Sequence, residues 1–135
     1  MSSRGVGNAA ENRAEKELEA NGYLVERARP DLRWIGPGRC RSMAHDIFGA
    51  FDLFAVKANA ADSSEDRIRL IQVTAGSGVN ERRMKVAAMH PKMPYEISLE
   101  VWRWRGGRAK KTDRIKRGWI KEYLDRIRLD WVEMD

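Results

Sequence analysis

The sequence has few residues of the kinds that form disulfides or metal sites, and it has no long apolar run. Cys40 is its only cysteine, which excludes an internal disulfide and a zinc site built on several cysteines. The two histidines, His45 and His90, lie too far apart in the sequence to suggest a shared metal site. No apolar run approaches the roughly 18–20 residues that cross a membrane, and the first residues lack the apolar core of a signal peptide. We therefore expect a cytosolic protein with no membrane partner.

The chain has the composition of a globular protein and an excess of positive charge. Its 135 residues are 42% hydrophobic and 34% charged, which suits one domain, residues 1–135, with a substantial core. The formal net charge is +6. Basic proteins of this size often bind nucleic acid, but positive charge also serves solubility alone, and composition leaves both interpretations open.

Turn residues and hydrophobic periodicity predict alternating helices and strands. Asn8 followed by Glu11 resembles a capping box that begins the first helix, and Gly22 is a typical helix terminator. Residues 95–104 alternate apolar and polar side chains, which indicates a strand. The expected elements are a helix over residues 9–21, strands over 23–25, 51–56 and 69–74, a helix over 81–89 that Asn80 begins, a strand over 95–104 and a helix over 115–128.

Two segments of this pattern need comment. Trp119, Tyr123 and Ile127 recur at four-residue spacing, which favours the last helix and a core role for these residues. Residues 29–44 hold two prolines and four arginines and are expected to be an irregular basic loop, either functional or a plain surface flap. The element order predicts an α/β fold with a mixed sheet flanked by helices.

A carboxylate and an amide lie within the two central strands. Asp52 begins the apolar run 51–56, and Gln72 lies near the end of the run 69–74. A charge in such a setting is costly unless it is paired or binds a metal, so Asp52 is the strongest candidate for a functional residue.

Taken together, three motifs resemble the PD-(D/E)XK nuclease superfamily. They are Glu11 on a helix that leads to Gly22-Tyr23, Asp52 at the head of a strand, and Gln72-Val73-Thr74 on the next strand. In order and spacing they are closest to archaeal Holliday-junction resolvases and their phage relatives, over residues 8–89. The resemblance implies a restriction-endonuclease-like α/β sandwich, to which residues 95–131 add a strand, a basic turn and a helix.

The resemblance also implies a Mg²⁺ or Mn²⁺ site that hydrolyses phosphodiester bonds. Such cations prefer oxygen ligands, activate a water and offset the charge that builds on the phosphate. The implied metal ligands are Asp52, Gln72, the backbone carbonyl of Val73 and Glu11.

The third motif departs from the family pattern. Gln72 stands where the family has an acid, and Thr74 stands where it has a lysine that orients the water and stabilises charge. Lys85 on the following helix is the candidate replacement for that lysine. Asp46 is a candidate for an additional carboxylate.

Each motif residue also has a purely structural interpretation. Glu11 can cap its own helix, and Asp52 can be a turn residue at a strand end. Gln72 can be a buried amide with satisfied hydrogen bonds, and Thr74 is a common strand residue. If neither Lys85 nor Asp46 compensates for the altered third motif, the chain is a nuclease fold that only binds DNA.

A cluster of positive charge lies near the C-terminus, interleaved with Trp102 and Trp104. Basic side chains on a turn suit phosphate contacts, and aromatic rings offer stacking, although burial of at least one tryptophan is expected. The residues expected to bind nucleic acid are Arg103, Arg105, Arg108, Lys110, Lys111, Arg114, Lys116 and Arg117. Without a base-reading motif they predict backbone contacts, and hence recognition of DNA shape.

The function expected from the resemblance is a Mg²⁺-dependent DNA endonuclease selective for junction or branched DNA. The residues expected to be catalytic are Asp52, Gln72, Glu11 and Lys85. A junction needs two symmetric cuts, so the resemblance implies a homodimer, in the cytoplasm of a prokaryote or of a phage-infected cell. The alternative is a catalytically degenerate DNA-binding protein of the same fold. A third hypothesis is a protein-interaction module anchored by Trp34, Trp102 and Trp104.

Overall fold

The computed structural model describes residues 3–29, 31–43, 46–58, 67–105 and 118–134. The helices are α1, Ser3–Ala20, and α2, Val79–Ala87, with a short 3-10 helix, η1, at His90–Lys92. The strands are β1 Leu24–Arg27, β2 Asp31–Gly36, β3 Arg39–Met43, β4 Leu53–Val56, β5 Ile68–Thr74, β6 Ile97–Arg105, β7 Gly118–Asp125 and β8 Asp130–Glu133. Within these described residues, no helix is both long and apolar enough to span a bilayer.

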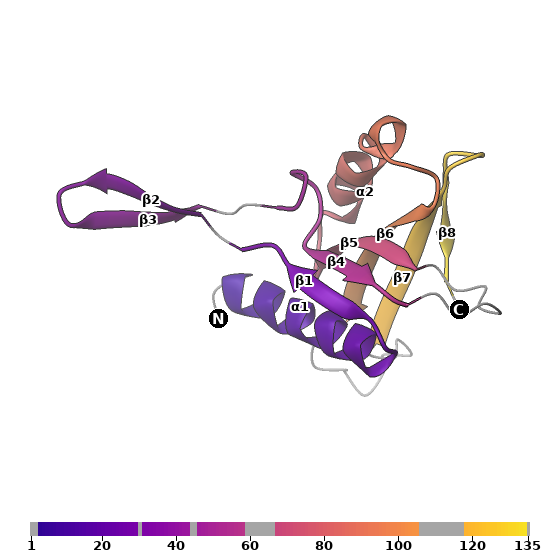
Figure 1. Cartoon of the computed structure of the whole chain (residues 1–135), viewed down its shortest axis with the longest axis horizontal. Coiled ribbons are helices and arrows are strands. Elements are labelled where there is room, and N and C mark those ends of the chain that lie inside the picture. Colours follow the sequence, from indigo (N-terminus) through magenta and orange to yellow (C-terminus); the bar gives the residue numbers. More distant parts are fainter. Residues whose placement is uncertain (1–2, 30, 44–45, 59–66, 106–117, 135) are drawn as a thin grey trace.

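The body of the molecule is a six-stranded sheet with one helix on each face. Its strand order is β1-β4-β5-β6-β7-β8, with α1 below the sheet and α2 above it in Figure 1. β5 and β6 pair in parallel and the other neighbours in this sheet are antiparallel. The predicted α/β class and mixed sheet between helices are confirmed.

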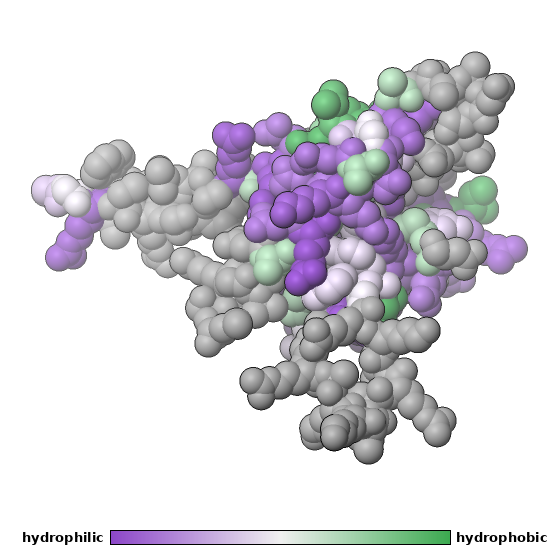
Figure 2. Space-filling view, turned by 90° about the horizontal axis from the view of Figure 1, so that it is seen from below, coloured by the Kyte–Doolittle hydropathy of each residue, from purple (hydrophilic) through white to green (hydrophobic). Residues whose placement is uncertain are grey.

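The two faces of the sheet carry two separate apolar cores. Ala10, Ala14 and Leu18 give α1 a buried stripe, which packs on the side of Ile71 and Val73. The other core packs Val86 of α2 with sheet residues that include Leu70, Leu99, Val101 and Leu124. Since neighbouring residues of a strand face opposite ways, Gln72 falls on the α2 side of β5. Figure 2, seen from the α1 side, shows a mostly hydrophilic surface over the described residues.

The ends of α1 only partly follow the sequence prediction. The helix begins at Ser3, so Asn8 and Glu11 lie inside it and the predicted capping box is wrong. Its other end is as expected. Gly22 has a φ of 90°, its N–H donates to the Glu19 carbonyl (3.0 Å), and the Tyr23 N–H donates to the Leu18 carbonyl (3.0 Å). These two bonds form a Schellman motif, which a positive φ at the glycine makes possible.

Helix α2 begins two residues earlier than predicted. Its N-cap is Gly78 and makes no side-chain cap bond, so the predicted capping role of Asn80 is wrong. Asn80 lies in the first turn, where its Oδ1 accepts a hydrogen bond from Arg83 (3.1 Å).

The segment predicted as an irregular loop, residues 29–44, contains the antiparallel hairpin β2–β3. Its turn holds Pro37 and Gly38, and the positive φ of Gly38 (70°) suits the third position of a type II turn. Pro37 and Gly38, which suggested an irregular loop, instead form the tip, and Gly36 is the last residue of β2. The hairpin forms its own two-stranded sheet.

The last helix, predicted over residues 115–128, is also wrong. Residues 118–125 form β7, a turn follows, and β8 completes the edge of the sheet. The side chains of β7 alternate with period two: Lys121 pairs with Glu17 of α1 (2.6 Å), and Glu122 pairs with Arg83 of α2 on the opposite face. Pairing with β6 therefore overrides the helical spacing of the aromatic residues, a known weakness of local patterns.

Candidate functional site

Asp52 lies in the middle of the sheet, immediately before β4. Its backbone N–H donates to the Ile71 carbonyl (2.9 Å), and its carbonyl accepts from the Ala28 N–H (2.8 Å). The backbone of Asp52 is thereby held between the two neighbouring strands, and the residue is 9% exposed. Its position does not depend on a flexible loop.

The Asp52 carboxylate is bound from β5. Its Oδ2 accepts hydrogen bonds from the Gln72 side-chain Nε2 (2.6 Å) and from the Val73 backbone N–H (2.8 Å). Burial nevertheless raises the pKa of Asp52 to about 7, against the lowering effect of the Val73 hydrogen bond. The negative charges of Glu11 and Asp46 raise this pKa further, and Arg82 opposes them. A buried carboxyl that titrates near neutral pH is typical of functional sites.

Gln72 contributes an oxygen without a partner. The residue is 1% exposed, and its buried Oε1 accepts no hydrogen bond from the described residues. Its Nε2 also donates weakly to the Val73 carbonyl (3.3 Å). Leaving a buried acceptor unsatisfied costs about 1–3 kcal/mol, so Gln72 is not the fully satisfied amide of the structural interpretation.

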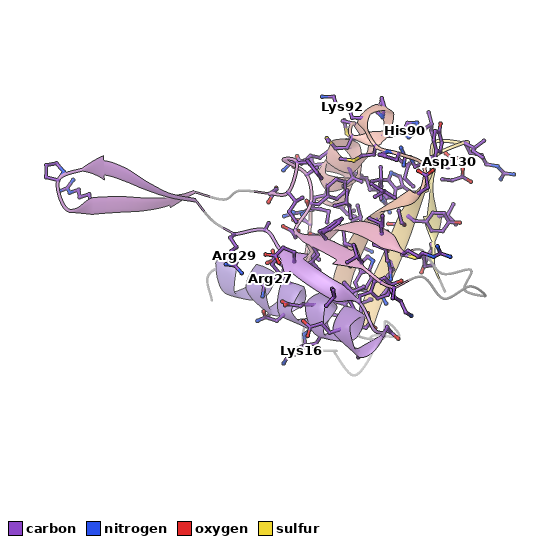
Figure 3. All side chains as sticks on the ribbon, in the orientation of Figure 1. Lys16, Arg27, Arg29, His90, Lys92 and Asp130 are labelled. Carbon is purple, nitrogen blue, oxygen red and sulfur yellow. The ribbon has the colours of Figure 1, made fainter. Side chains whose placement is uncertain are left out.

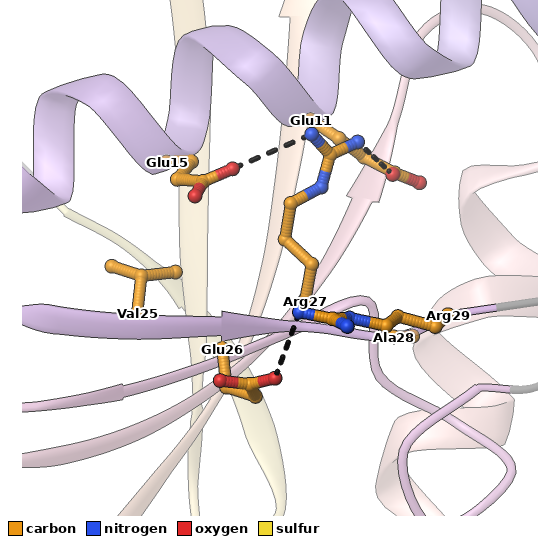
Figure 4. Close-up of a pocket in the computed structure, with 7 residues that line it drawn as sticks. All are labelled: Glu11, Glu15, Val25, Glu26, Arg27, Ala28 and Arg29. Carbon is orange, nitrogen blue, oxygen red and sulfur yellow. Dashed lines mark hydrogen bonds and ion pairs between the residues drawn. The ribbon is translucent and has the colours of Figure 1, made fainter.

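Glu11 approaches the site from α1 but is engaged by a neighbour. Its Oε2 accepts from Arg27 of β1 (2.9 Å), which also contacts Glu15 (3.4 Å). Figure 4 shows these residues around a cavity of about 330 Å³, lined also by Val25, Glu26, Ala28 and Arg29. Asp52 and Gln72 are not among the lining residues, but the cavity adjoins Asp52 through Ala28, whose N–H donates to the Asp52 carbonyl.

The two candidate replacements for the altered third motif meet each other. Lys85 Nζ lies 3.0 Å from Asp46 Oδ2, with the Lys85 side chain 51% exposed. Asp46 in turn acts on the pKa of Asp52, as does Arg82 one turn before Lys85. The structure therefore joins Lys85 to Asp46, and it makes Glu11, Asp46 and Arg82 the charged residues that act on the pKa of Asp52.

The oxygen atoms near Asp52 are the candidate ligands for the implied Mg²⁺ or Mn²⁺. In the described part of the chain, no three His, Cys, Asp or Glu side chains are close enough to hold a metal by themselves. The available donors are instead the Asp52 carboxyl, whose pKa is about 7, and the Gln72 amide oxygen, which has no partner among the described residues. Glu11 and the Val73 carbonyl are further candidate donors. Oxygen donors of this kind fit Mg²⁺ or Mn²⁺, which complete their coordination with water.

The predicted basic surface is described only in part. Arg103 and Arg105 lie on β6, and Arg103 pairs in register with Thr74, two residues beyond Gln72. The other basic residues fall outside the described residues; they are Arg108, Lys110, Lys111, Arg114, Lys116 and Arg117.

The tryptophans among these charges are packed against the body. Trp102 is 1% exposed, with Lys121 Nζ 4.1 Å from its ring centroid. Trp104 stacks edge-on against Trp119 at 5.1 Å and lies under Arg13. Burial of Trp102 is confirmed, so its ring is not free to stack on a base.

Sequence reasoning missed two residues of the site. Arg27 holds Glu11, and Arg82 acts on the charge of Asp52. Neither has a sequence signal, because each partner lies on a distant part of the chain and only the fold brings them together.

Comparison with family models, curated proteins and solved structures finds no match. Function therefore has to be inferred from the site itself.

Proposed function

We propose that the protein is a metal-dependent DNA endonuclease whose centre is Asp52. The observation that carries the proposal is the buried pair Asp52–Gln72, in which a carboxyl of raised pKa lies beside an amide whose oxygen has no partner among the described residues. A fold does not keep such a costly pair for stability, and oxygen-rich polar pairs of this kind are what a hard cation binds.

Mg²⁺ or Mn²⁺ would be held by Asp52, Gln72, the Val73 carbonyl and Glu11. When bound, the cation supplies Lewis-acid activation of water and neutralises charge on the phosphate. A half-turn of the Gln72 amide exchanges the positions of Nε2 and Oε1. The same side chain can therefore donate a hydrogen bond to Asp52, or offer the cation an amide oxygen beside the Asp52 carboxylate.

Three basic side chains complete the proposed chemistry. In this proposal Lys85, which is ion-paired with Asp46, would stabilise negative charge at the phosphate and orient the attacking water, as the missing lysine of the third motif would. Arg27 positions Glu11 by a direct ion pair. Arg82 favours the ionised form of Asp52 that binds a cation.

The order of elements also supports this proposal. A helix with Glu11, a strand headed by Asp52, the neighbouring strand with Gln72 and a following helix with Lys85 succeed each other along the chain as in the PD-(D/E)XK superfamily. We accordingly propose a restriction-endonuclease-like sandwich. The proposed substrate is branched or junction DNA, cut by a homodimer in the cytoplasm.

The test is a cleavage assay on four-way junction, flap and linear duplex DNA, with Mg²⁺, Mn²⁺ or EDTA. We expect metal-dependent cutting that Asp52→Asn abolishes. The matched control is Asp130→Asn. Asp130, labelled in Figure 3, is an exposed carboxylate on β8, which is the edge strand opposite β1. Cutting by the Asp52→Asn variant at the rate of the parent protein would overturn the proposal.

A second candidate function is DNA binding without cleavage. It is favoured by the replacement of the acid and the lysine of the third motif by Gln72 and Thr74, and by the lack of a three-acid cluster among the described residues. It predicts salt-sensitive DNA binding that EDTA and Asp52→Asn leave unchanged, with no cutting under any metal.

A further inference from the structure

The hairpin β2–β3 stands apart from the rest of the fold. Its strands pair with each other and belong to a sheet of their own. Figure 1 shows the ribbon extending from the body, beyond the end of α1. From residue 29 to residue 43 the sequence holds four arginines and one acid, namely Arg29, Arg33, Arg39, Arg41 and Asp31. The ribbon therefore carries a strong excess of positive charge in sequence.

Both roots of the hairpin are tied to the candidate site. On the N-terminal side, the Ala28 N–H donates to the Asp52 carbonyl (2.8 Å). On the C-terminal side, Asp46 is ion-paired with Lys85 (3.0 Å). Figure 3 labels Arg27 and Arg29 at the root of the ribbon. The ribbon therefore leaves the body at the proposed catalytic centre.

The register of the hairpin opposes like charges. Arg33 lies directly across from Arg41, and Arg39 follows at the turn. Like charges at directly opposed positions destabilise an antiparallel pair, and an anion bound between them removes that cost. The carboxylates at Asp52, Glu11 and Asp46 are negatively charged when ionised and therefore repel a phosphate backbone. A basic element beside this centre supplies the attraction that the centre lacks.

The dimensions of the ribbon suit duplex DNA. Six residues of β2 span about 20 Å, and a two-stranded ribbon fits the major groove of B-DNA. Arginines on such a ribbon contact phosphates on both sides of the groove.

We propose that the hairpin β2–β3 is an arm that binds duplex DNA, with Arg33, Arg39 and Arg41 contributing charge for phosphates of the same duplex that presents a bond to Asp52. This inference rests on the proposed function, because it takes DNA as the substrate of the same site. We expect the arm to position the duplex without reading its sequence, because contacts to phosphates carry no sequence information.

The test measures DNA affinity of the full chain in EDTA, by fluorescence anisotropy across a salt series. The variant Arg33→Gln/Arg41→Gln is compared with Lys92→Gln/Arg128→Gln, which removes the same charge from exposed positions. Lys92 lies in η1 (Figure 3), and Arg128 lies in the turn between β7 and β8, at the edge of the sheet opposite β1. Loss of two phosphate contacts is expected to weaken binding on the order of 10- to 100-fold at 0.1 M salt and to reduce the salt slope by about two. The control is expected to bind within about twofold of the parent chain.

A conservative variant keeps the inference open to refutation if the first variant folds poorly. Arg33→Lys/Arg41→Lys preserves both charges and is expected to restore most of the affinity, because lysine also binds phosphate. Equal DNA affinity of the Gln variant, its control and the parent chain would overturn the proposal that the hairpin binds DNA. That result would leave Asp52-dependent cleavage intact, so the arm and the nuclease proposal fail separately.

A second copy of this chain is the other occupant that a projecting ribbon can have. A photo-crosslinker on Cys40, the only cysteine of the chain and part of β3, distinguishes the two partners. Crosslinks to DNA support the arm. Crosslinks only between protein chains, with a Gln variant that becomes monomeric in sedimentation but binds DNA normally, overturn it.

Discussion

The Asp52 carboxyl is held in the folded chain at a cost that depends on pH. Its pKa rises from an ordinary value of 3.8 to about 7, chiefly because burial disfavours the charged form. The folded state therefore binds a proton that the unfolded state releases above pH 4. Stability from this group is complete below pH 4 and is lost as pH rises through 7.

Asp52→Asn is therefore expected to unfold less readily than the parent chain at pH 8 without divalent metal. One pKa unit corresponds to about 1.4 kcal/mol, so the gain approaches about 4 kcal/mol above pH 7 and vanishes near pH 4. An asparagine amide can also donate to the unpartnered Gln72 Oε1. Urea unfolding between pH 4 and pH 8 checks this, with Asp130→Asn as control. A difference that does not change with pH would contradict the buried-charge account.

Glu100 and Arg69 form a second buried charge pair, on the α1 side of the sheet. Two hydrogen bonds join them (2.5 and 2.7 Å), and the Trp102 Nε1 donates to the same carboxylate (2.9 Å). Glu100 is fully buried, and the Arg69 guanidinium lies over the rings of Tyr23 and Trp102. We expect a structural role for this network, because its hydrogen bonds join α1-side residues of the sheet to one another.

Glu100→Gln should destabilise the fold by about 3–5 kcal/mol, because it leaves the Arg69 charge buried without a counter-charge. The double variant Arg69→Met/Glu100→Leu should recover most of that loss, since no charge is then left buried. Urea denaturation of the two variants measures the difference. A single variant within about 1 kcal/mol of the parent chain would show that water reaches Arg69.

At the scale of elements, the turn that ends α1 fixes the path into β1. Gly22 has a φ of 90°, and a Cβ at this position would lie 3.4 Å from Lys57 Cε. Gly22→Ala is expected to cost about 1–2 kcal/mol, mainly through the left-handed backbone and not through the contact. Thermal unfolding measures the cost. Gly36→Ala, where an added Cβ meets nothing, is the control on the hairpin.

The elements that the sequence predicts well are those with strong local signals. The apolar runs at β4 and β5 and the helix α2 lie within a few residues of their predicted bounds, because burial on both faces leaves a continuous apolar stretch. The segment at β7 has a helical spacing of Trp119 and Tyr123 that is accidental, and only pairing with β6 decides its state. The hairpin was missed because its glycines and prolines mark a turn as readily as a loop.

The candidate site was predicted by residue type but not by contact. Asp52 and Gln72 could be singled out because polar groups within apolar runs need partners. Their direct hydrogen bond depends on the antiparallel pairing of β4 with β5, which the sequence does not specify. The ion pairs Glu11–Arg27 and Asp46–Lys85 join residues of different elements, and no local pattern encodes them.

At the scale of the whole molecule, a bound cation should be visible as added stability. Mg²⁺ at a hundred times its Kd would stabilise the fold by about 2.7 kcal/mol. The effect should weaken as pH falls below 7, because protons compete for Asp52. Thermal scans with and without Mg²⁺ test this on the parent chain and on Asp52→Asn. An equal rise in Tm for both proteins would place the cation elsewhere.

Strands β1 and β4 pair directly although the hairpin lies between them in the chain. Arg27 and Leu53 are partners in register, and Ala28 still bonds to Asp52, so the hairpin is an excursion from a closed ladder. Doubling the length of such an excursion changes the entropy of closing it by only about 0.6 kcal/mol. The sheet thus tolerates ribbons of different length and sequence at this one junction. Grafting a foreign hairpin between Ala28 and Asp46 is accordingly a route to new recognition properties on an unchanged core.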